Sequence, residues 1–284
     1  MKSTPRSWTK PKWLAPIFAI LVVVCGIKAF SDTMAIPVVM RTNIAFQSFP
    51  AEAPPVTIAL ISDIHIAGPD MPPERLGKIV EQINALSPEF LLVAGDFISE
   101  KRTATHIYTA EEAIAPLKKL DDRIVKIAVA GNHDHWFDMP ALNAELDEAG
   151  FRVLVNDAVK AGPLVIGGLD DDFTGRADLP RMLAAMSRLE GGRVVLSHSP
   201  DPFPELPANF GLMLAGHTHC GQLRYPWGGS PASMSDYGDQ YACGRVDENG
   251  NTVITGAGLG TSLLPIRFFS KPEIWMITVS APAF

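Results

Sequence analysis

The stretch VTIALISDIH, residues 56–65, decides the fold of this chain. Its unbroken apolar run from Val56 to Ser62 is typical of a strand that is buried on both faces, and the run ends in the polar residues Asp63 and His65. The pattern then alternates, with a helix expected at 74–85, a strand at 90–94, a helix at 110–120 and a strand at 124–130. Such alternation predicts crossover units on a parallel sheet.

The flanking segments add strands to this core. Apolar side chains alternate at Val38, Met40, Ile44 and Phe46, which predicts an edge strand that ends before Pro50. In the second half we expect helices at 139–149 and 179–189, strands at 151–155, 164–166, 193–197 and 212–215, and a late hairpin at Asn249 and Gly250. The expected architecture is α/β, a four-layer αββα sandwich of two mixed β-sheets flanked by helices.

The N-terminal end has the pattern of a membrane segment. Basic residues at 2, 6, 10 and 12 precede an uncharged run at 13–27, which Lys28 closes and which Ala29 and Phe30 lengthen toward the roughly 20 residues of a span. A cleaved signal peptide is the alternative, but no small-x-small cleavage site follows, and Val24 is large for the position before a lipoprotein cysteine.

These features predict four segments: a basic cytoplasmic flank (1–12), a single transmembrane anchor or uncleaved signal-like segment (13–30), a short linker (31–36) and a folded domain (37–284). Because basic residues stay on the cytoplasmic side, we expect the domain on the extracytoplasmic side of an inner (plasma) membrane. Membrane lipid is then a partner of the N-terminal segment.

Charge and cysteine content narrow the remaining possibilities. The net charge of -7 and the lack of a basic stripe argue against a nucleic-acid partner, since binding to a phosphate backbone needs clustered cations. Cys25 lies in the apolar segment, and Cys220 and Cys243 can either pair outside the cytoplasm or remain buried thiols. The sequence does not give the distance between their Cα atoms, on which a disulfide depends, and buried thiols are the favoured interpretation.

Short polar clusters follow several of the expected strands. All of their members are imidazole, carboxylate or amide side chains: Asp63 and His65 in SDIH, Asp96 in AGDF, Asn132 and His133 in GNHD, His198 in LSHSPD, and His217 and His219 in GHTH. In open α/β sheets, ligands bind beyond the carboxyl ends of the strands. Burying carboxylates there is costly unless a cation compensates them, so the pattern predicts a metal site.

The ordered set DxH, GD, GNHD, a histidine after a strand, and GHTH resembles the calcineurin-like metallophosphoesterase superfamily. The sequence around these motifs is similar to the membrane-anchored bacterial phosphodiesterase-like branch of that superfamily, over residues 37–284. The segments that carry this similarity are LISDIH, GHTHCGQLR and GLGTSLLPIRFFSKPEI. The resemblance implies hydrolysis of a phosphate ester or anhydride, with metal-bound hydroxide as nucleophile at a dinuclear centre.

The resemblance also implies a role for each motif residue. One divalent ion would be held by Asp63, His65, Asp96 and His219, and the other by Asp96, Asn132, His198 and His217, so that Asp96 bridges the pair. Mixed nitrogen and oxygen ligands suit Mn, Zn or Fe. His133 matches the catalytic histidine that contacts the phosphate and protonates the leaving oxygen.

Departures from the family pattern concern the groups around these ligands. Where phosphoprotein phosphatases have GDxxDRG, this chain has GDFISEK, with Ser99 and Glu100 at the positions of the second Asp and the Arg. The partner that orients His133 is therefore unassigned, and Asp134 is a local candidate.

Phosphate-binding cations must then come from elsewhere, and Arg224 and Arg267 are the candidates, ahead of Arg176. The remaining polar residues near the motifs are expected to be ordinary loop residues: His106, His135, Asp170 and Asp171.

The leading hypothesis is a hydrolase of phosphodiesters or pyrophosphates at the outer face of a membrane. Two alternatives are a pyrophosphohydrolase of a lipid-linked envelope precursor and a non-catalytic envelope module that binds phosphate in the same cleft.

Overall fold

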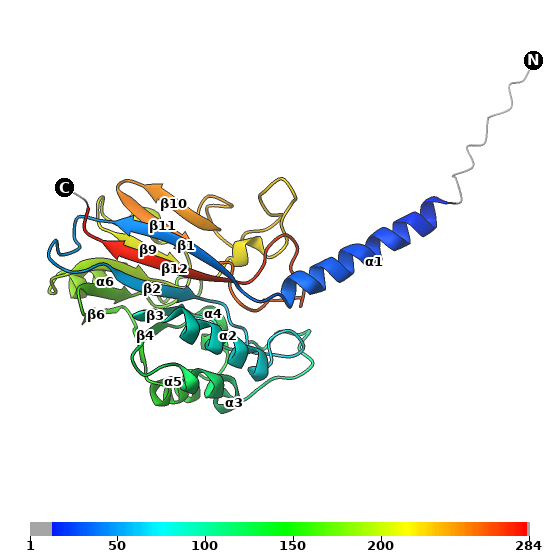
Figure 1. Ribbon diagram of the computed structural model, residues 1–284, viewed down its shortest axis with the longest axis horizontal. Coiled ribbons are helices and arrows are strands. Elements are labelled where there is room, and N and C mark those ends of the chain that lie inside the picture. Colours follow the sequence, from blue (N-terminus) through cyan, green and yellow to red (C-terminus); the bar gives the residue numbers. More distant parts are fainter. Residues whose placement is uncertain (1–12, 283–284) are drawn as a thin grey trace, which may run out of the picture.

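The strands assemble into two six-stranded sheets that pack face to face (Figure 1). The computed structural model describes residues 13–282. Sheet one has the order β1 (Val38–Ala45), β12 (Glu273–Ser280), β2 (Val56–Ile61), β3 (Phe90–Ala94), β4 (Val125–Val129), β5 (Phe151–Val153). Sheet two has the order β10 (Gly244–Glu248), β11 (Asn251–Thr255), β9 (Leu212–Ala215), β8 (Gly192–Leu196), β7 (Leu164–Gly168), β6 (Asp157–Ala161).

Both sheets are mixed. In sheet one, β2, β3, β4 and β5 run parallel, and β12 is inserted antiparallel to β2 with Val279 opposite Val56. The predicted edge strand β1 pairs parallel with β12. In sheet two, β7, β8, β9 and β11 run parallel, while β6 and β10 are antiparallel edges. The hairpin predicted at Asn249 and Gly250 joins β10 to β11.

Three apolar clusters explain the layers. Ile58 and Leu60 of β2 point into the core between the sheets, whereas Ala59 and Ile61 point to the opposite face, because successive strand residues alternate. That outer face packs against α2 (Pro73–Leu86), α3 (Ala110–Ile114) and α5 (Met139–Glu148). The outer face of sheet two packs against α6 (Leu179–Met186). The layer order is αββα, and the predicted fold class is confirmed.

Some element boundaries differ from the sequence prediction. The helix expected at 110–120 divides into α3 and the 3-10 helix η1 (Ala115–Lys119), because Pro116 lacks the N–H that would continue the α-helical ladder. Strand β6 and the short helix α4 (Asn132–Trp136) were not predicted. β6 is a partly exposed edge with the sequence DAVKA, which lacks a buried-strand signal.

An apolar helix, α1 (Leu14–Thr33), projects away from the sandwich (Figure 1). Among the described residues it is the one helix long and apolar enough to cross a membrane, and most of it is exposed. Its last turn contacts the domain: Arg75 donates to the carbonyl of Thr33 at 2.6 Å. The basic flank predicted at 1–12 lies outside the described residues.

Candidate metal centre

The polar clusters converge at the carboxyl ends of strands from both sheets. Sheet one contributes Asp63 and His65 after β2, Asp96 after β3, and Asn132 after β4. Sheet two contributes His198 after β8, and His217 and His219 after β9. All seven side chains are buried. Parallel pairing brings the carboxyl ends of the strands to one edge of each sheet, and the face-to-face packing of the sheets places the two edges together.

Five of these residues have a left-handed backbone conformation, which only glycine adopts readily: Asp63 (φ 49°), His65 (φ 49°), Asp96 (φ 55°), His217 (φ 67°) and His219 (φ 52°). Each such residue costs roughly 1–2 kcal/mol and persists only where the surroundings enforce it. Hydrogen bonds from the cluster itself supply part of that enforcement, since the backbone N–H of His217 donates to the carboxylate of Asp63 at 3.0 Å. Backbone strain concentrated in this way is typical of a functional site.

The donor atoms form two adjoining groups. In the first, Nε2 of His65 lies 3.0 Å from Nε2 of His219, which is 3.4 Å from Oδ1 of Asp63. In the second, Nε2 of His198 lies 3.1 Å from both Oδ1 of Asn132 and Nδ1 of His217.

One carboxylate oxygen joins the two groups. Oδ2 of Asp96 is 3.4 Å from Nε2 of His65 in the first group and 3.3 Å from Nε2 of His198 in the second. Asp96 therefore occupies the position between the groups.

These donors fit a divalent cation. Several lone-pair atoms face one another at hydrogen-bond distance in a buried space, an arrangement that a shared cation stabilises. The Nδ1 of His198 contacts the carbonyl of Ala94 at 2.7 Å, and donation of its proton there leaves Nε2 free to bind. Glycine makes room for the cluster, because a Cβ at Gly131 would lie 2.2 Å from Oδ1 of Asp96.

Comparisons with known proteins agree with this geometry. The family model "Calcineurin-like phosphoesterase" matches residues 56–221, more than half of the chain. The chain belongs to this family. It is 31% identical over 219 residues to YkuE, a metallophosphoesterase of Bacillus subtilis, covering 73% of each chain. It is 25% identical to a transmembrane protein with metallophosphoesterase domain from Danio rerio, covering 92% of this chain and 61% of the relative.

Solved structures of low sequence identity were also found. TT1561 of Thermus thermophilus is 13% identical, with a TM-score of 0.45, over 72% of this phosphoesterase and 90% of that chain. A dimetal phosphatase of Danio rerio is 15% identical, with a TM-score of 0.44, over 72% and 88%. The family and the clustered donors together indicate a divalent metal site in a hydrolase of phosphoester bonds.

Electrostatics within the cluster favour the ligating forms of Asp96, His65, His217 and His219. Burial tends to raise the pKa of Asp96, but the fields of His198 and His65 prevail and lower it, so the carboxylate stays ionised. Burial lowers the pKa of His65 and of His219, and it lowers the pKa of His217 to about 3. These three imidazoles are therefore neutral, the form that binds a cation.

His198 differs from the other imidazoles of the cluster, because its surroundings favour the protonated, positively charged ring. Burial opposes its protonation, but the carboxylate of Asp96 outweighs burial and raises the pKa of His198 to about 10. The buried carboxylates thus favour positive charge at this point.

His133 of this phosphoesterase is oriented by Glu100, which the sequence did not reveal as its partner. Its Nδ1 lies 3.1 Å from both carboxylate oxygens of Glu100. Burial tends to lower the pKa of His133, but the hydrogen bond to Glu100 and the charge of Asp96 raise it. The available signal was a carboxylate four residues after Asp96 in the same loop.

The local candidate Asp134 has a different role. Its carboxylate accepts from the backbone N–H groups of Asp96 and Phe97 at 2.8 Å and of Gly131 at 2.9 Å. Burial raises its pKa to about 7. Asp134 therefore joins the loops that follow β3 and β4, and the expectation that it could orient His133 is corrected.

The two candidate arginines lie beside the His219 side of the cluster. Arg267 is fully buried, and its Nη2 donates to the carbonyls of Ala257 at 2.7 Å and Gly260 at 2.5 Å and lies 3.3 Å from Nδ1 of His219. Arg224 is half-buried and donates to the carbonyl of Cys220 at 3.2 Å. These contacts hold backbone next to His219 of the donor cluster, and contact with a substrate phosphate stays a prediction for both.

Other residues singled out in the sequence lie around the rim of the site. His135 pairs with Asp170 at 2.7 Å, and both line a pocket of about 550 Å³ together with Arg176. Phe173, which was not singled out in the sequence, contacts the ring of His217 with centroids 4.8 Å apart.

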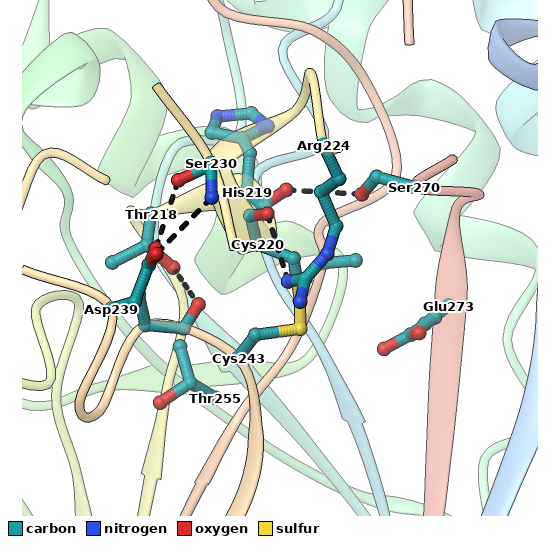
Figure 2. The surroundings of a disulfide bond; sticks show 12 residues. Thr218, His219, Cys220, Arg224, Ser230, Asp239, Cys243, Thr255, Ser270 and Glu273 are labelled. Atoms are coloured by element: carbon teal, nitrogen blue, oxygen red, sulfur yellow. Dashed lines mark hydrogen bonds between the residues drawn. A yellow bond between two sulfur atoms is a disulfide. The ribbon is translucent and has the colours of Figure 1, made fainter. Parts of the chain in front are cut away.

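Cys220 and Cys243 form a disulfide beside the cluster, with Cα atoms 4.5 Å apart (Figure 2). This corrects the favoured interpretation of buried thiols. The bond closes the segment that follows His219, and the hydroxyl of Thr218 reinforces the closure by donating to the carbonyl of Ala242 at 2.6 Å. The pairing depends on how that segment folds back, which the 23-residue separation does not encode.

Proposed function

We propose that this phosphoesterase holds two divalent ions, Mn, Zn or Fe, and hydrolyses a phosphodiester or pyrophosphate at the outer face of a membrane. The observation that carries the dinuclear proposal is the position of Asp96 between the two donor groups. One ion would be bound by Asp63, His65, Asp96 and His219, and the other by Asp96, Asn132, His198 and His217. Bound ions would polarise the phosphate and lower the pKa of a water molecule.

The protein's own acid is His133. Its ring lies against that of His65, with centroids 4.7 Å apart, and one of its ring nitrogens lies within 4.8 Å of donor atoms of His65 and Asp96, so it borders the cluster. With Nδ1 held by Glu100, the opposite nitrogen, Nε2, is free to contact a phosphate oxygen and to donate a proton to the leaving oxygen. Glu100 is then a positioning residue that fixes the ring and favours its protonated form.

The surroundings of His133 favour a diester or anhydride over a phosphorylated protein side chain. Ser99 and Glu100 replace the Asp and Arg that phosphoprotein phosphatases use at these positions. Glu100 leaves no phosphate-binding guanidinium at the position of the Arg. Ser99, at the position of the Asp, is buried, and its hydroxyl accepts from the backbone N–H of Lys101 at 3.2 Å.

The location is supported by three features. α1 is long and apolar enough to serve as the anchor, and the basic residues before it favour a cytoplasmic N-terminus. The Cys220–Cys243 disulfide suits an oxidising compartment outside the cytoplasm. Relatives from Danio rerio and Bos taurus are described as transmembrane proteins with metallophosphoesterase domain.

The deciding experiment uses the full chain, purified in detergent. Its metal content is measured, and its turnover is compared on bis(p-nitrophenyl) phosphate, p-nitrophenyl phosphate and a lipid pyrophosphate. We expect two ions per chain and faster turnover of diester or pyrophosphate. Preference for the monoester contradicts the substrate proposal, and a chain that binds ions but cleaves none of the three supports the binding-module alternative.

A further inference from the structure

The loop formed by residues 260–270, here called the rim loop, lies against the metal cluster. Its first residue, Gly260, donates its N–H to the carbonyl of Asp63 at 2.8 Å. Near its end, Ser270 donates to the carbonyl of His219 at 3.2 Å. Arg267 fills the space between these points with a fully buried side chain. The rim loop therefore forms one wall of the candidate site.

The same loop also packs against the base of α1. The N–H of Arg267 donates to the carbonyl of Ala29 at 3.3 Å, and the N–H of Phe269 donates to the carboxylate of Asp32 at 3.3 Å. Lys28 pairs with Asp32 at 2.7 Å, and its ammonium lies 4.9 Å from the ring centroid of Phe269. The apolar helix, the rim loop and the cluster are thus joined by direct contacts.

Large apolar side chains of the rim loop face outward. Leu263 is 71% exposed, Leu264 47% and Phe269 45%. A neighbouring loop pairs with the rim loop through Leu223 and Phe268 and adds Tyr225 and Trp227, whose rings stack 5.3 Å apart. Both loops lie at the end of the sandwich from which α1 departs (Figure 1).

The position of the two loops along the axis of α1 indicates which part of a membrane they would contact. Lys28 closes the apolar run, so residues 28–32 mark the point where a membrane-spanning α1 leaves the hydrocarbon. The rim loop packs at this level, where the polar headgroups of the bilayer lie. Trp and Tyr favour this interface, and leucines next to a span can insert their side chains between headgroups.

We propose that Leu263, Leu264, Phe269, Tyr225 and Trp227 insert into the headgroup region of the bilayer that α1 crosses. This docking turns the wall of the candidate site toward the lipid surface. Phosphate esters at the lipid–water interface are then the substrate class, a step that rests on the proposed function. The docking itself does not depend on activity.

The docking is tested by placing a fluorophore at single cysteines of the full-length chain in vesicles of phosphatidylcholine and phosphatidylglycerol. Cys25→Ser removes the free thiol, and Leu263→Cys or Trp227→Cys supplies the labelling position. Val125→Cys is the matched control, because Val125 is 42% exposed and begins β4, at the end of the strand opposite the site.

We expect emission from positions 263 and 227 to shift to the blue and to be quenched by lipids that carry a spin label near the headgroup, while position 125 stays unquenched. Equal behaviour at all three positions, in chains that float with the vesicles, overturns the docking. A chain that does not float with the vesicles contradicts the anchor as well.

The substrate consequence has its own experiment. Leu263→Asp combined with Leu264→Asp should reduce hydrolysis of phosphatidyl-p-nitrophenol in vesicles about tenfold, because burial of apolar area is lost at the interface. Hydrolysis of soluble bis(p-nitrophenyl) phosphate should be unchanged, as should both activities in Val125→Asp. Equal losses on the two substrates overturn the interfacial role, whereas a wild-type chain that cleaves neither contradicts the proposed function and leaves the quenching result intact.

Discussion

The two sheets hold their parts of the cluster of donor side chains by different means. On the side of sheet one, the loops after β3 and β4 are joined by Asp134, which lies two residues after the ligand-type Asn132. On the side of sheet two, the GHTH segment is held by residues farther along the chain, through the disulfide to Cys243 and contacts with Arg267 and Ser270. In the first half the loops after β3 and β4 hold each other and Asp63 accepts from the distant residues His217 and Gly260, whereas the GHTH segment depends on distant segments.

Asp96→Asn should have the largest effect, because Asp96 contacts both halves. We expect most of the bound metal to be lost and turnover to fall roughly 10³-fold, the upper range for removing one group that stabilises transition-state charge. Metal analysis and steady-state kinetics measure this, with the exposed Asp122→Asn as the control. A variant that keeps two ions and ordinary turnover would disprove the bridging role.

His133→Ala removes a residue on the side of sheet one and should affect protonation of the leaving group without affecting metal binding. Metal content should be unchanged, and turnover should fall about 10²-fold for esters with poor leaving groups, because protonation matters most for a basic departing oxygen. Activated aryl esters should lose least. A series of esters with graded leaving-group pKa measures the trend, and uniform losses across the series would exclude proton donation.

Glu100→Gln should have a smaller effect, since the ring of His133 loses its charged partner but remains in place. We expect about a tenfold loss of kcat, within the range for residues that orient another group, with metal content unchanged. Glu100→Asp should restore part of the activity. The leaving-group trend should resemble that of His133→Ala, and Glu111→Gln, on an exposed carboxylate of α3, should be silent. A loss with no leaving-group trend would indicate a merely structural role.

Cys220→Ser combined with Cys243→Ser should have the smallest effect on turnover and should act on the other half. Loss of the bond should lower the free energy of unfolding by about 3 kcal/mol, the value expected for a loop of this size. Metal affinity should fall a few-fold, because His217 and His219 adjoin the bond. Thermal unfolding and metal titration measure both, and an unchanged melting temperature would show that the disulfide does not restrain this half.

Local sequence patterns predicted much of the fold, and they predicted that the donor residues lie at the carboxyl ends of the strands. The bounds of β3 and β9 match the sequence prediction, because a short apolar run between polar residues marks a buried strand without reference to its partners. The strand-end motifs are equally local, and parallel pairing of β2 with β3 brings Asp63 and Asp96 together, whereas the packing of the two sheets adds His198. β6 was not predicted, because a half-exposed edge strand has no such apolar run.

The sequence by itself determined the order of the strands' apolar runs, the donor residues at their ends and the apolar N-terminal helix, since each depends on neighbours within a few residues. Only the tertiary structure decided that Glu100 contacts His133, that Cys220 pairs with Cys243, and that the rim loop joins the cluster to α1. Each of these contacts joins separate loops or elements. Such contacts depend on where whole elements pack, and the spacing of residues along the chain does not give the distance between two side chains in the folded protein.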